Sequence, residues 1–460
     1  MRRGWLIKPF ALLTRLQQWR RLRLTSLGAL IAGGAVGAGV FSVDTQQTLA
    51  FQITSLLVSL LAISLLFAAR FRPRLRVERR LPDYATVGVP ISYSIRLHNL
   101  SSKEEQLSLG LVDQLNTALP SAADYRNHRE APRIDNWFDR ILGFRRWLRL
   151  VTLHRGAKVD PVSVSRLAPN DLIEVTLSLL PLRRGYIYFE STVLQRPDPL
   201  GLLNAIARYL TPQPLLVLPR RYRVPVIALG NHRRYQPGGM HLASNVGDSR
   251  EFLSLRDYNA GDPLRHIHWR SWAKTGKPIV KQFQDEFFNR QALILDTFGN
   301  PGACFEEAVS IAASFVLGQH ETDALTDLLF VGTRAVQASA GRGLGSTAHL
   351  LELLACVQPA SAQDFDALRR LVMQSVTKLS GAIVVLLAWD TRRQEFIREL
   401  RALQIPLVVL IVTEADPQNV GPGPLRDEPG RLCVVRPSHV EDDLAALTRP
   451  NTNNFRKATR

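Results

Sequence analysis

Cysteine is scarce in this chain of 460 residues, which contains only three: Cys304, Cys356 and Cys433. They are odd in number and far apart, and they form neither a CxxC pair nor the Cys/His spacing of a zinc site. This excludes a small scaffold held together by disulfides. We expect three reduced thiols in a cytosolic environment.

A P-loop is also missing, because no segment matches GxxxxGK[ST]. Any ATP hydrolysis linked to this chain would therefore belong to a partner. Acidic residues are almost absent near the N-terminus: residues 1–80 hold 13 Lys and Arg against Asp44 and Glu78, which is +11 of the net charge of +18. The other 380 residues are close to an ordinary balance, so the basic composition does not predict nucleic-acid binding.

Charge is wholly absent from two runs, residues 24–43 and 49–69. Each has about the 20 residues that an apolar helix needs to cross a bilayer. The link between them, residues 44–48, allows only a tight turn, so we expect a hairpin of two transmembrane helices in contact with lipid on its outer faces. Gly33 and Gly37 form a GxxxG spacing that permits close helix packing or is incidental in a glycine-rich segment.

Arginines flank this hairpin on both outer sides, in a basic leader over residues 1–23 and again over residues 70–80. The positive-inside rule then predicts an inner-membrane, multi-pass protein whose N- and C-termini are cytoplasmic. The same cations suit anionic headgroups. A cleaved signal peptide, with small residues near Ala38, is the alternative interpretation of the first run.

Residues 70–218 read as a β-rich, sandwich-like domain. Apolar and polar residues alternate over 91–98, with Ile91, Tyr93, Ile95 and Leu97 on one face, and the pattern recurs over 172–178. An insert over residues 120–158 contains an amphipathic segment whose aromatic face includes Trp147. That segment fits either a helix lying on the bilayer surface or one covering a sheet edge.

Residues 219–245 read as a linker, residues 246–290 as a separate extension, and residues 449–460 as a basic tail. Between them, residues 291–448 alternate buried strands with helices, which predicts a doubly wound α/β domain. The whole chain is thus expected to be a membrane-anchored multidomain protein of mixed α+β and α/β class.

Polar residues gather where strands of the α/β domain are expected to end, which is where such sheets bind ligands. Asp296 and Asp390 each close a predicted strand, Asn300 follows the first, and Thr347 opens a helix. Carboxylate, amide and hydroxyl oxygens suit a hard cation such as Mg²⁺. No other cofactor is expected.

The extension carries the segment REFLSLRDYNAGDPLRHIHWRSWAKTGKPIVKQF, residues 250–283. It closely resembles the motif block of the bacterial domain-of-unknown-function 58 family. The residues that carry the resemblance, and that we expect to form a partner-binding surface, are Glu251, Phe252, Arg256, Tyr258, Gly261, Asp262, Arg265, Ile267, Trp269, Ala273, Thr275 and Gly276.

This resemblance implies that the C-terminal domain is similar to von Willebrand factor A domains, in which a D-x-S-x-S segment binds a metal ion. Asp296 matches the aspartate of that segment, but Phe298 and Asn300 replace its serines. Thr347 and Asp390 resemble the later ligands. A phenyl ring removes a coordinating oxygen, which favours a degenerate site.

Three interpretations of the extension remain at the level of the sequence. Its cations and tryptophans suit a nucleic acid, but interspersed acids argue against nucleic-acid binding as a function. His266 and His268 form a metal pair only if a third ligand joins them. We favour a tight turn at residues 259–262, bidentate arginine clamps, and tryptophans that seal the extension onto the α/β domain.

The family resemblance implies a membrane-tethered adaptor rather than an enzyme. Family members accompany MoxR-type AAA+ ATPases, so the chain is expected to bind such an ATPase and to act in assembly or maturation of protein complexes. The alternative is a metal-dependent enzyme that uses Asp296 and Asp390, although no catalytic constellation is evident in the sequence.

Overall fold

The chain divides into two compact units, residues 1–218 and residues 219–460. The computed structural model describes residues 7–41, 48–103, 105–116, 119–121, 124–125, 143–225, 227, 252–259, 262, 264–283, 290–318, 325–341, 346–360 and 364–448.

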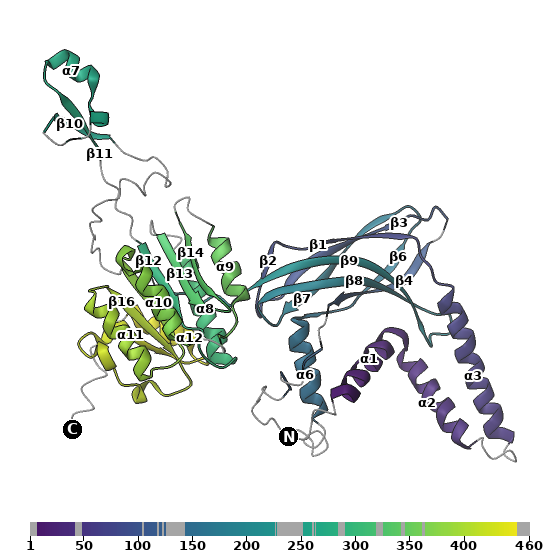
Figure 1. The fold of residues 1–460 in the computed structure, drawn as a ribbon. Helices are drawn as coiled ribbons and strands as arrows, with labels where there is room; N and C mark the ends of the chain where they lie inside the picture. The colour runs from purple at the N-terminus through teal and green to yellow at the C-terminus, as the bar shows by residue number, and fades with distance from the viewer. Residues whose placement is uncertain are drawn as a thin grey trace. The chain divides into compact units, whose positions relative to one another are not determined.

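The first unit is built on two facing β-sheets (Figure 1), whose inner faces share one apolar core. Every neighbouring pair of strands is antiparallel except β2 and β9, which are parallel. In sheet order, the strands are β1 (Leu75–Arg80), β3 (Ile91–Asn99), β7 (Leu172–Pro181) and β5 (Ala157–Val159) in one sheet, and β2 (Tyr84–Thr86), β9 (Asn204–Leu218), β8 (Gly185–Pro197), β4 (Gln106–Leu115) and β6 (Val162–Leu167) in the other.

The period-two patterns in the sequence are confirmed in this sandwich. Tyr93, Ile95 and Leu97 are buried along β3, while the intervening side chains are not. Val175 and Leu177 lie on the buried face of β7, which pairs with β3. Alternating apolar positions stabilise a sheet only when they all reach one face, so the pattern fixes which face turns inward.

Three helices precede the sandwich: α1 (Ile7–Arg23), α2 (Ser26–Phe41) and α3 (Thr48–Ala69). Figure 1 shows α2 and α3 side by side, and both extend from the same end of the sandwich. By length and composition, only Leu49–Ala69 qualifies as a candidate membrane span among the described residues, because the apolar part of α2, Ser26–Val40, is shorter. The sequence had predicted two equivalent spans.

The leader was not predicted to be helical, yet α1 packs on α6 (Phe144–Arg155). Trp147 of α6 is fully buried, and its indole N–H donates to the Thr14 hydroxyl of α1 at 2.9 Å. The Phe10 ring lies beside the Trp147 ring, with centroids 6.1 Å apart. The described part of the amphipathic segment therefore covers another helix; residues 126–142 lie outside the described residues.

The loop between β8 and β9 joins the sandwich to α2 and α3. The Thr25 hydroxyl donates to the Gly201 carbonyl at 2.7 Å, and the Ser64 hydroxyl donates to Asp198 Oδ2 at 2.6 Å. Asp198 Oδ1 also accepts the backbone N–H groups of Leu202 and Leu203 at 2.7 and 2.9 Å. One buried carboxylate thus fixes the loop and holds it against α3.

The second unit contains a six-stranded sheet in the order β14-β13-β12-β15-β16-β17. All neighbours are parallel except β13 and β14, which pair antiparallel. This order places the first strand of the domain in the centre and reverses direction there, as in doubly wound sheets. The strands are β12 (Arg290–Leu295), β13 (Leu325–Val331), β14 (Ala335–Ala340), β15 (Gly381–Leu386), β16 (Leu407–Val412) and β17 (Leu432–Val435).

Helices cover both faces of this sheet. Ala292 and Ile294 of β12 share a core with α10 and α11, whereas α8 contacts β12, β15 and β16 and contributes nothing to that core, so α8 covers the other face. The helices are α8 (Ala303–Gly318), α9 (Thr347–Cys356), α10 (Asp366–Ser375), α11 (Thr391–Ala402) and α12 (Val440–Ala445), with 3₁₀ turns η5 (Val376–Lys378), η6 (Pro417–Asn419), η7 (Gly423–Leu425), η8 (Pro429–Arg431) and η9 (Ala446–Thr448).

Candidate functional site

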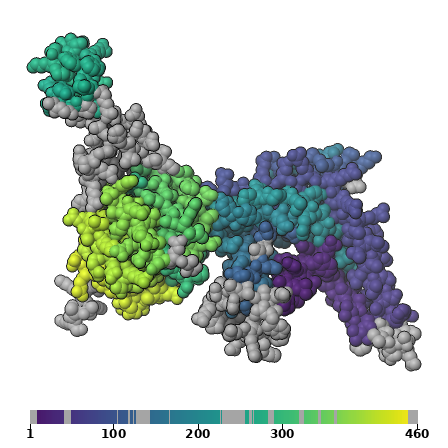
Figure 2. Space-filling view, viewed as in Figure 1, coloured from purple at the N-terminus to yellow at the C-terminus, as the bar shows by residue number. Residues whose placement is uncertain are grey.

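The family-motif residues form a small module of their own within the second unit, which we call the motif module (residues 252–259, 262 and 264–283). Its frame is an antiparallel pair, β10 (Phe252–Asp257) and β11 (Ile279–Phe283). The connection between these strands holds the 3₁₀ turn η3 (Leu264–His266) and the helix α7 (Trp269–Thr275). Figure 2 shows the module as a compact teal body. Ile267 and Val280 are its buried apolar contacts.

A tight turn at Asp262 closes the module. The Asp262 N–H donates to the Asn259 carbonyl at 3.0 Å, and the Asn259 N–H donates back to Asp262 Oδ2 at 3.0 Å. Arg256 on β10 binds the same carboxylate with both terminal nitrogens, each at 2.7 Å. This hydrogen bonding, first from Arg256 and then from the Asn259 backbone, holds the pKa of Asp262 below its ordinary value.

The helix α7 is fixed at both of its ends. His268 lies at the N-cap, and its Nδ1 is 2.6 Å from the Ser271 hydroxyl. Thr275 donates its hydroxyl to the Ser271 carbonyl at 3.0 Å. Gly276 then ends the helix with φ +66°, a left-handed conformation that favours glycine, and its N–H donates to the Trp272 carbonyl.

The two tryptophans of α7 stack on each other, with ring centroids 5.3 Å apart. The sequence had predicted that the tryptophans seal the extension onto the α/β domain, but 64% of Trp269 is exposed. Leu264, in η3, is 66% exposed. The exposed cations beside these apolar groups are Arg270, Lys274 and Lys277.

The other motif residues take structural positions or lie outside the description. The Tyr258 N–H donates to the Pro278 carbonyl at 3.0 Å, which links the two strands. Glu251 and Gly261 lie outside the described residues, and for Arg265 only the backbone, in η3, is described.

The strand-end carboxylates lie at the switch point between β12 and β15. Asp296 directly follows β12 and is fully buried. Its Oδ1 accepts the Phe298 N–H at 2.9 Å, and its Oδ2 accepts the Leu387 N–H at 3.1 Å. The same Oδ2 accepts Nε of Arg393 at 2.6 Å, in an ion pair whose side chains are 0% and 7% exposed.

Asp390 contacts the same arginine. It does not end a strand, because β15 stops at Leu386; instead it caps α11, where its Oδ1 accepts the Arg393 N–H at 2.9 Å. Its Oδ2 accepts Nη1 of Arg393 at 2.5 Å. Arg393 also donates Nη2 to the Phe298 carbonyl at 2.8 Å. One guanidinium therefore joins both of the predicted metal-binding carboxylates.

One aromatic ring lies against this guanidinium and is packed against a second. The central carbon of the guanidinium lies 4.9 Å from the centre of the Phe365 ring, and the Phe298 and Phe365 rings meet edge to face at 5.9 Å. Burial on its own would lower the pKa of Arg393, but hydrogen bonds and charge, from Asp296 and then from Asp390, keep it raised. The group remains a cation.

The other two predicted ligands are not joined to this cluster. Asn300 is exposed and Thr347 is half-buried at the start of α9; within the described residues, neither hydrogen-bonds to Asp296 or Asp390. The described ranges also contain no group of three His, Cys, Asp or Glu side chains arranged for a metal ion. Arg393 was missed in the sequence, although its i+3 spacing from Asp390 was a usable signal.

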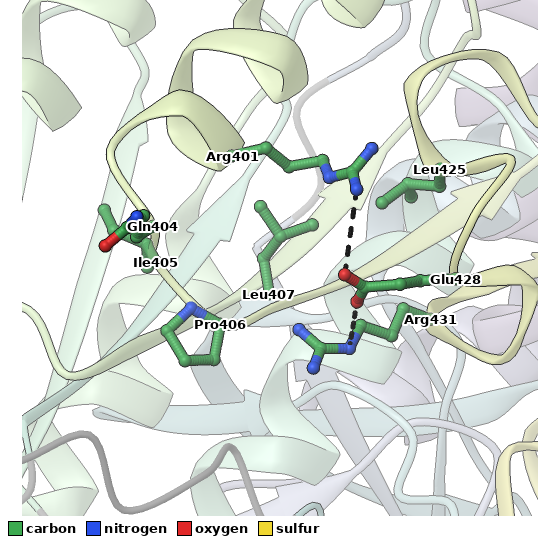
Figure 3. Close-up of a pocket in the computed structure, with 8 residues that line it drawn as sticks. All are labelled: Arg401, Gln404, Ile405, Pro406, Leu407, Leu425, Glu428 and Arg431. Atoms are coloured by element: carbon green, nitrogen blue, oxygen red, sulfur yellow. Dashed lines mark ion pairs between the residues drawn. The ribbon is translucent and has the colours of Figure 1, made fainter.

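A separate cavity of about 260 Å³ lies at the opposite, amino end of β16 (Figure 3). Glu428 bridges two arginines there, Arg401 at 3.7 Å and Arg431 at 2.6 Å. The charged groups of this cavity thus pair with each other. The cavity also lies at the amino end of the strand, whereas doubly wound sheets bind ligands at the carboxyl ends. The lining residues are Arg401, Gln404, Ile405, Pro406, Leu407, Leu425, Glu428 and Arg431.

A family model described as "Protein of unknown function DUF58" matches residues 254–426. The match confirms the family resemblance predicted from the motif and covers most of the motif module and most of the α/β domain. A curated relative, the "Uncharacterized protein YeaD" of Bacillus subtilis (strain 168), is 26% identical over 146 residues, which is 31% of this chain and 35% of YeaD. The chain thus matches about a third of the length of that relative.

Solved structures also match about a third of the chain, but only weakly. A CARDB domain from Pyrococcus furiosus, solved with di-metal ions, is 13% identical. The match covers 32% of this chain and 89% of the CARDB chain, with a TM-score of 0.17. A PapD-like domain of human CEP192 is 10% identical, covers 32% of this chain and 86% of its own, and gives 0.18. A cohesin module from Clostridium perfringens is 9% identical, covers 32% of this chain and 98% of its own, and gives 0.17. These scores support no functional conclusion.

Proposed function

We propose that this chain is a membrane-tethered protein-interaction protein that uses the motif module to dock a partner. The observation that carries the proposal is the exposed Trp269, stacked on the half-buried Trp272, with cations on the same short helix. Tryptophan and arginine are enriched where protein interfaces gain most of their binding energy. The Arg256–Asp262 pair and the capped α7 hold that surface in one shape before binding, which lowers the entropy lost on association.

The partner that this surface suits presents an apolar patch edged with acidic residues. A MoxR-type AAA+ ATPase is the proposed partner, and assembly or maturation of protein complexes is the proposed process; both rest on the family resemblance. In this scheme the chain supplies position and the ATPase supplies hydrolysis, since the sequence has no P-loop.

The tether in this proposal is the α2–α3 pair, inserted as a hairpin in the inner membrane with both chain ends in the cytoplasm. Three features support it: the apolar length of Leu49–Ala69, the packing of α2 against α3, and arginines on both outer flanks. A fluorescent protein fused after Arg460 should fluoresce, and alkaline phosphatase fused there should be inactive. The reverse pattern would reject this orientation.

A von Willebrand factor A-like fold is proposed for the α/β domain. The support is its strand order, with β12 in the centre, β14 antiparallel at one edge and Asp296 directly after the first strand. The alternative function, a metal-dependent enzyme built on Asp296 and Asp390, has less support because both carboxylates are already bound to Arg393.

The docking proposal is tested with the full-length protein in detergent. Trp269→Ala/Arg270→Ala should reduce capture of the purified ATPase at least tenfold, whereas Lys378→Ala, an exposed cation in η5, should leave capture unchanged. Equal capture by both variants would reject the docking surface. Tight, steeply salt-dependent binding of single-stranded DNA by the full-length protein, lost in the double variant, would assign the surface to nucleic acid instead.

A further inference from the structure

The strand-end site of the α/β domain invites the question of whether it fits a metal ion. The predicted ligands Asp296 and Asp390 do come together, so the site has the negative charge that a divalent cation requires. Their oxygens, however, are engaged by donors of the protein itself. Asp296 Oδ1 accepts the Phe298 N–H, Asp296 Oδ2 accepts the Leu387 N–H and Arg393, and Asp390 Oδ1 accepts the Arg393 N–H.

We propose that Arg393 is the resident cation of this site, and that its guanidinium takes the place of a divalent metal ion between Asp296 and Asp390. The guanidinium donates to Asp296 at 2.6 Å, to Asp390 at 2.5 Å and to the Phe298 carbonyl at 2.8 Å. The Asp390 side chain is 49% exposed, but a metal ion could bridge it to the buried Asp296 only after the arginine, which is 6% exposed, had left.

The surroundings of the site are shaped for the arginine and not for a hydrated ion. The Phe365 ring lies 4.9 Å from the guanidinium carbon, and a planar, weakly hydrated cation stacks well on an aromatic face. Phe298 stands where an oxygen ligand would be needed, and its ring packs on Phe365 instead. Mg²⁺ keeps several of its waters when it binds, and this apolar wall offers them no partners.

The arrangement also explains how the site is built along the chain. Asp390 caps α11 and Arg393 lies one turn later on the same helix, so both are positioned by a single helix start. The ion pair between Arg393 and Asp296 holds the start of α11 against the end of β12. The ion pair therefore fastens α11 across the sheet switch point, and the domain should keep its fold and its partner binding without divalent ions.

The test compares Mn²⁺ binding and thermal unfolding in the full-length protein and four variants. Adding the wild-type protein should leave the electron paramagnetic resonance signal of free Mn²⁺ unchanged. Its melting temperature should be the same in EDTA and in millimolar Mg²⁺. Arg393→Ala uncovers two carboxylates, so it should melt several degrees lower and gain Mn²⁺ binding. Asp296→Asn/Arg393→Ala should lose that gained binding.

A second comparison separates an ion pair from general packing. Asp296→Asn/Arg393→Met removes both charges at once, so it should melt above Arg393→Ala, in which one buried carboxylate has lost its partner. If the wild type, with Arg393 in place, bound one Mn²⁺ and Asp296→Asn abolished that binding, the proposal would be overturned. Purely additive effects of the two substitutions on melting temperature would overturn it as well.

Discussion

Arg79 and Asp113 form a buried ion pair inside the β-sandwich, with Nε and Nη2 of the arginine 2.8 and 2.6 Å from the two carboxylate oxygens. Their side chains are 1% and 0% exposed. Asp113 also accepts hydroxyl hydrogen bonds from Tyr93 and Thr192, at 2.9 and 2.7 Å. The Asp113 oxygens thus accept hydrogen bonds that replace those lost to water on burial. A buried ion pair is stable only when this condition is met.

Removing one partner of this pair should be costly. Asp113→Ala leaves the Arg79 guanidinium buried without a counter-charge, so the free energy of unfolding should fall by about 3–5 kcal/mol. The control is Glu78→Ala, whose partner Arg76 is on the surface, where the two side chains are 69% and 50% exposed; it should change stability by less than about 1 kcal/mol. Denaturant titration of both variants distinguishes them, and equal losses would contradict the prediction.

The contact between α2 and the β8–β9 loop predicts a sharp difference between two glycines of one helix. A Cβ at Gly28 would lie 1.9 Å from the Leu202 carbonyl oxygen, which is backbone and cannot rotate away. Gly28→Ala should therefore push α2 off the sandwich and lower the melting temperature. Gly33→Ala is the matched control, since a Cβ there meets nothing within 4 Å and alanine gains up to about 1 kcal/mol in a helix.

The measurement for this pair is the melting temperature in detergent together with protease sensitivity of the β8–β9 loop. Gly28→Ala should expose Leu203 and its neighbours to cleavage, because the loop loses the Thr25 contact to Gly201. If both variants behave alike, α2 does not rest on the loop in solution.

Local pattern predicted much of the fold. The alternation along β3 and the fully apolar runs of β15 and β16 were readable because side-chain burial follows backbone periodicity directly. The strand β14 and the helix α10 were missed. β14 is an exposed-edge strand of mixed residues, AVQASA, whose burial pattern is irregular, so it carries no clear period.

The site was only half predictable. A tight turn at residues 259–262 and bidentate arginine clamps were predicted from the sequence, but not that Arg256 would clamp Asp262, a carboxylate of that turn. The partner of Asp296 is 97 positions away, and the contact depends on how α11 crosses the sheet. Such a pairing is set by tertiary packing and leaves no period in the sequence. The exposure of Trp269 was missed for the same reason.

Alkaline pH should loosen the contact between the start of the second unit and α8. The Tyr222 hydroxyl donates to Glu307 Oε2 at 2.5 Å, and its N–H donates to the Ser314 hydroxyl at 2.9 Å. Burial, and then Glu307, raise the pKa of Tyr222 to about 12, against about 10 in an unfolded chain. The folded state thus holds the proton more tightly than the unfolded state does.

The sign follows from that difference. The stabilising effect of the neutral phenol is fully present below pH 10 and is lost as the pH rises toward about 12. Stability of the wild type should therefore decline across this range, and Tyr222→Phe, which cannot ionise, should start lower by about 1 kcal/mol but lack that part of the decline. Denaturant midpoints at several pH values test this; parallel curves for the two proteins would contradict it.

The turn of the motif module should be acid-sensitive in the opposite sense. Hydrogen bonds from Arg256 and the Asn259 backbone keep the pKa of Asp262 below its ordinary value, so the folded turn favours the ionised carboxylate. The contribution of this carboxylate is complete above the unfolded aspartate pKa of about 3.9 and is lost as the pH falls through the lower folded value.

Two substitutions test whether the fork geometry of Arg256, and not merely its charge, holds this turn. Asp262→Asn removes the ionisable group, and Arg256→Lys keeps a cation but cannot donate two parallel hydrogen bonds to the carboxylate. Both should weaken the exciton circular dichroism of the stacked Trp269 and Trp272 at pH 7, whereas Lys274→Ala, on the exposed side of α7, should not. The wild type and Lys274→Ala should lose that signal as the pH drops below 4, whereas Asp262→Asn should show no such acid transition. A lysine variant with the wild-type spectrum and the wild-type acid midpoint would show that charge alone is sufficient, and that the bidentate contact does not shape the surface offered to a partner.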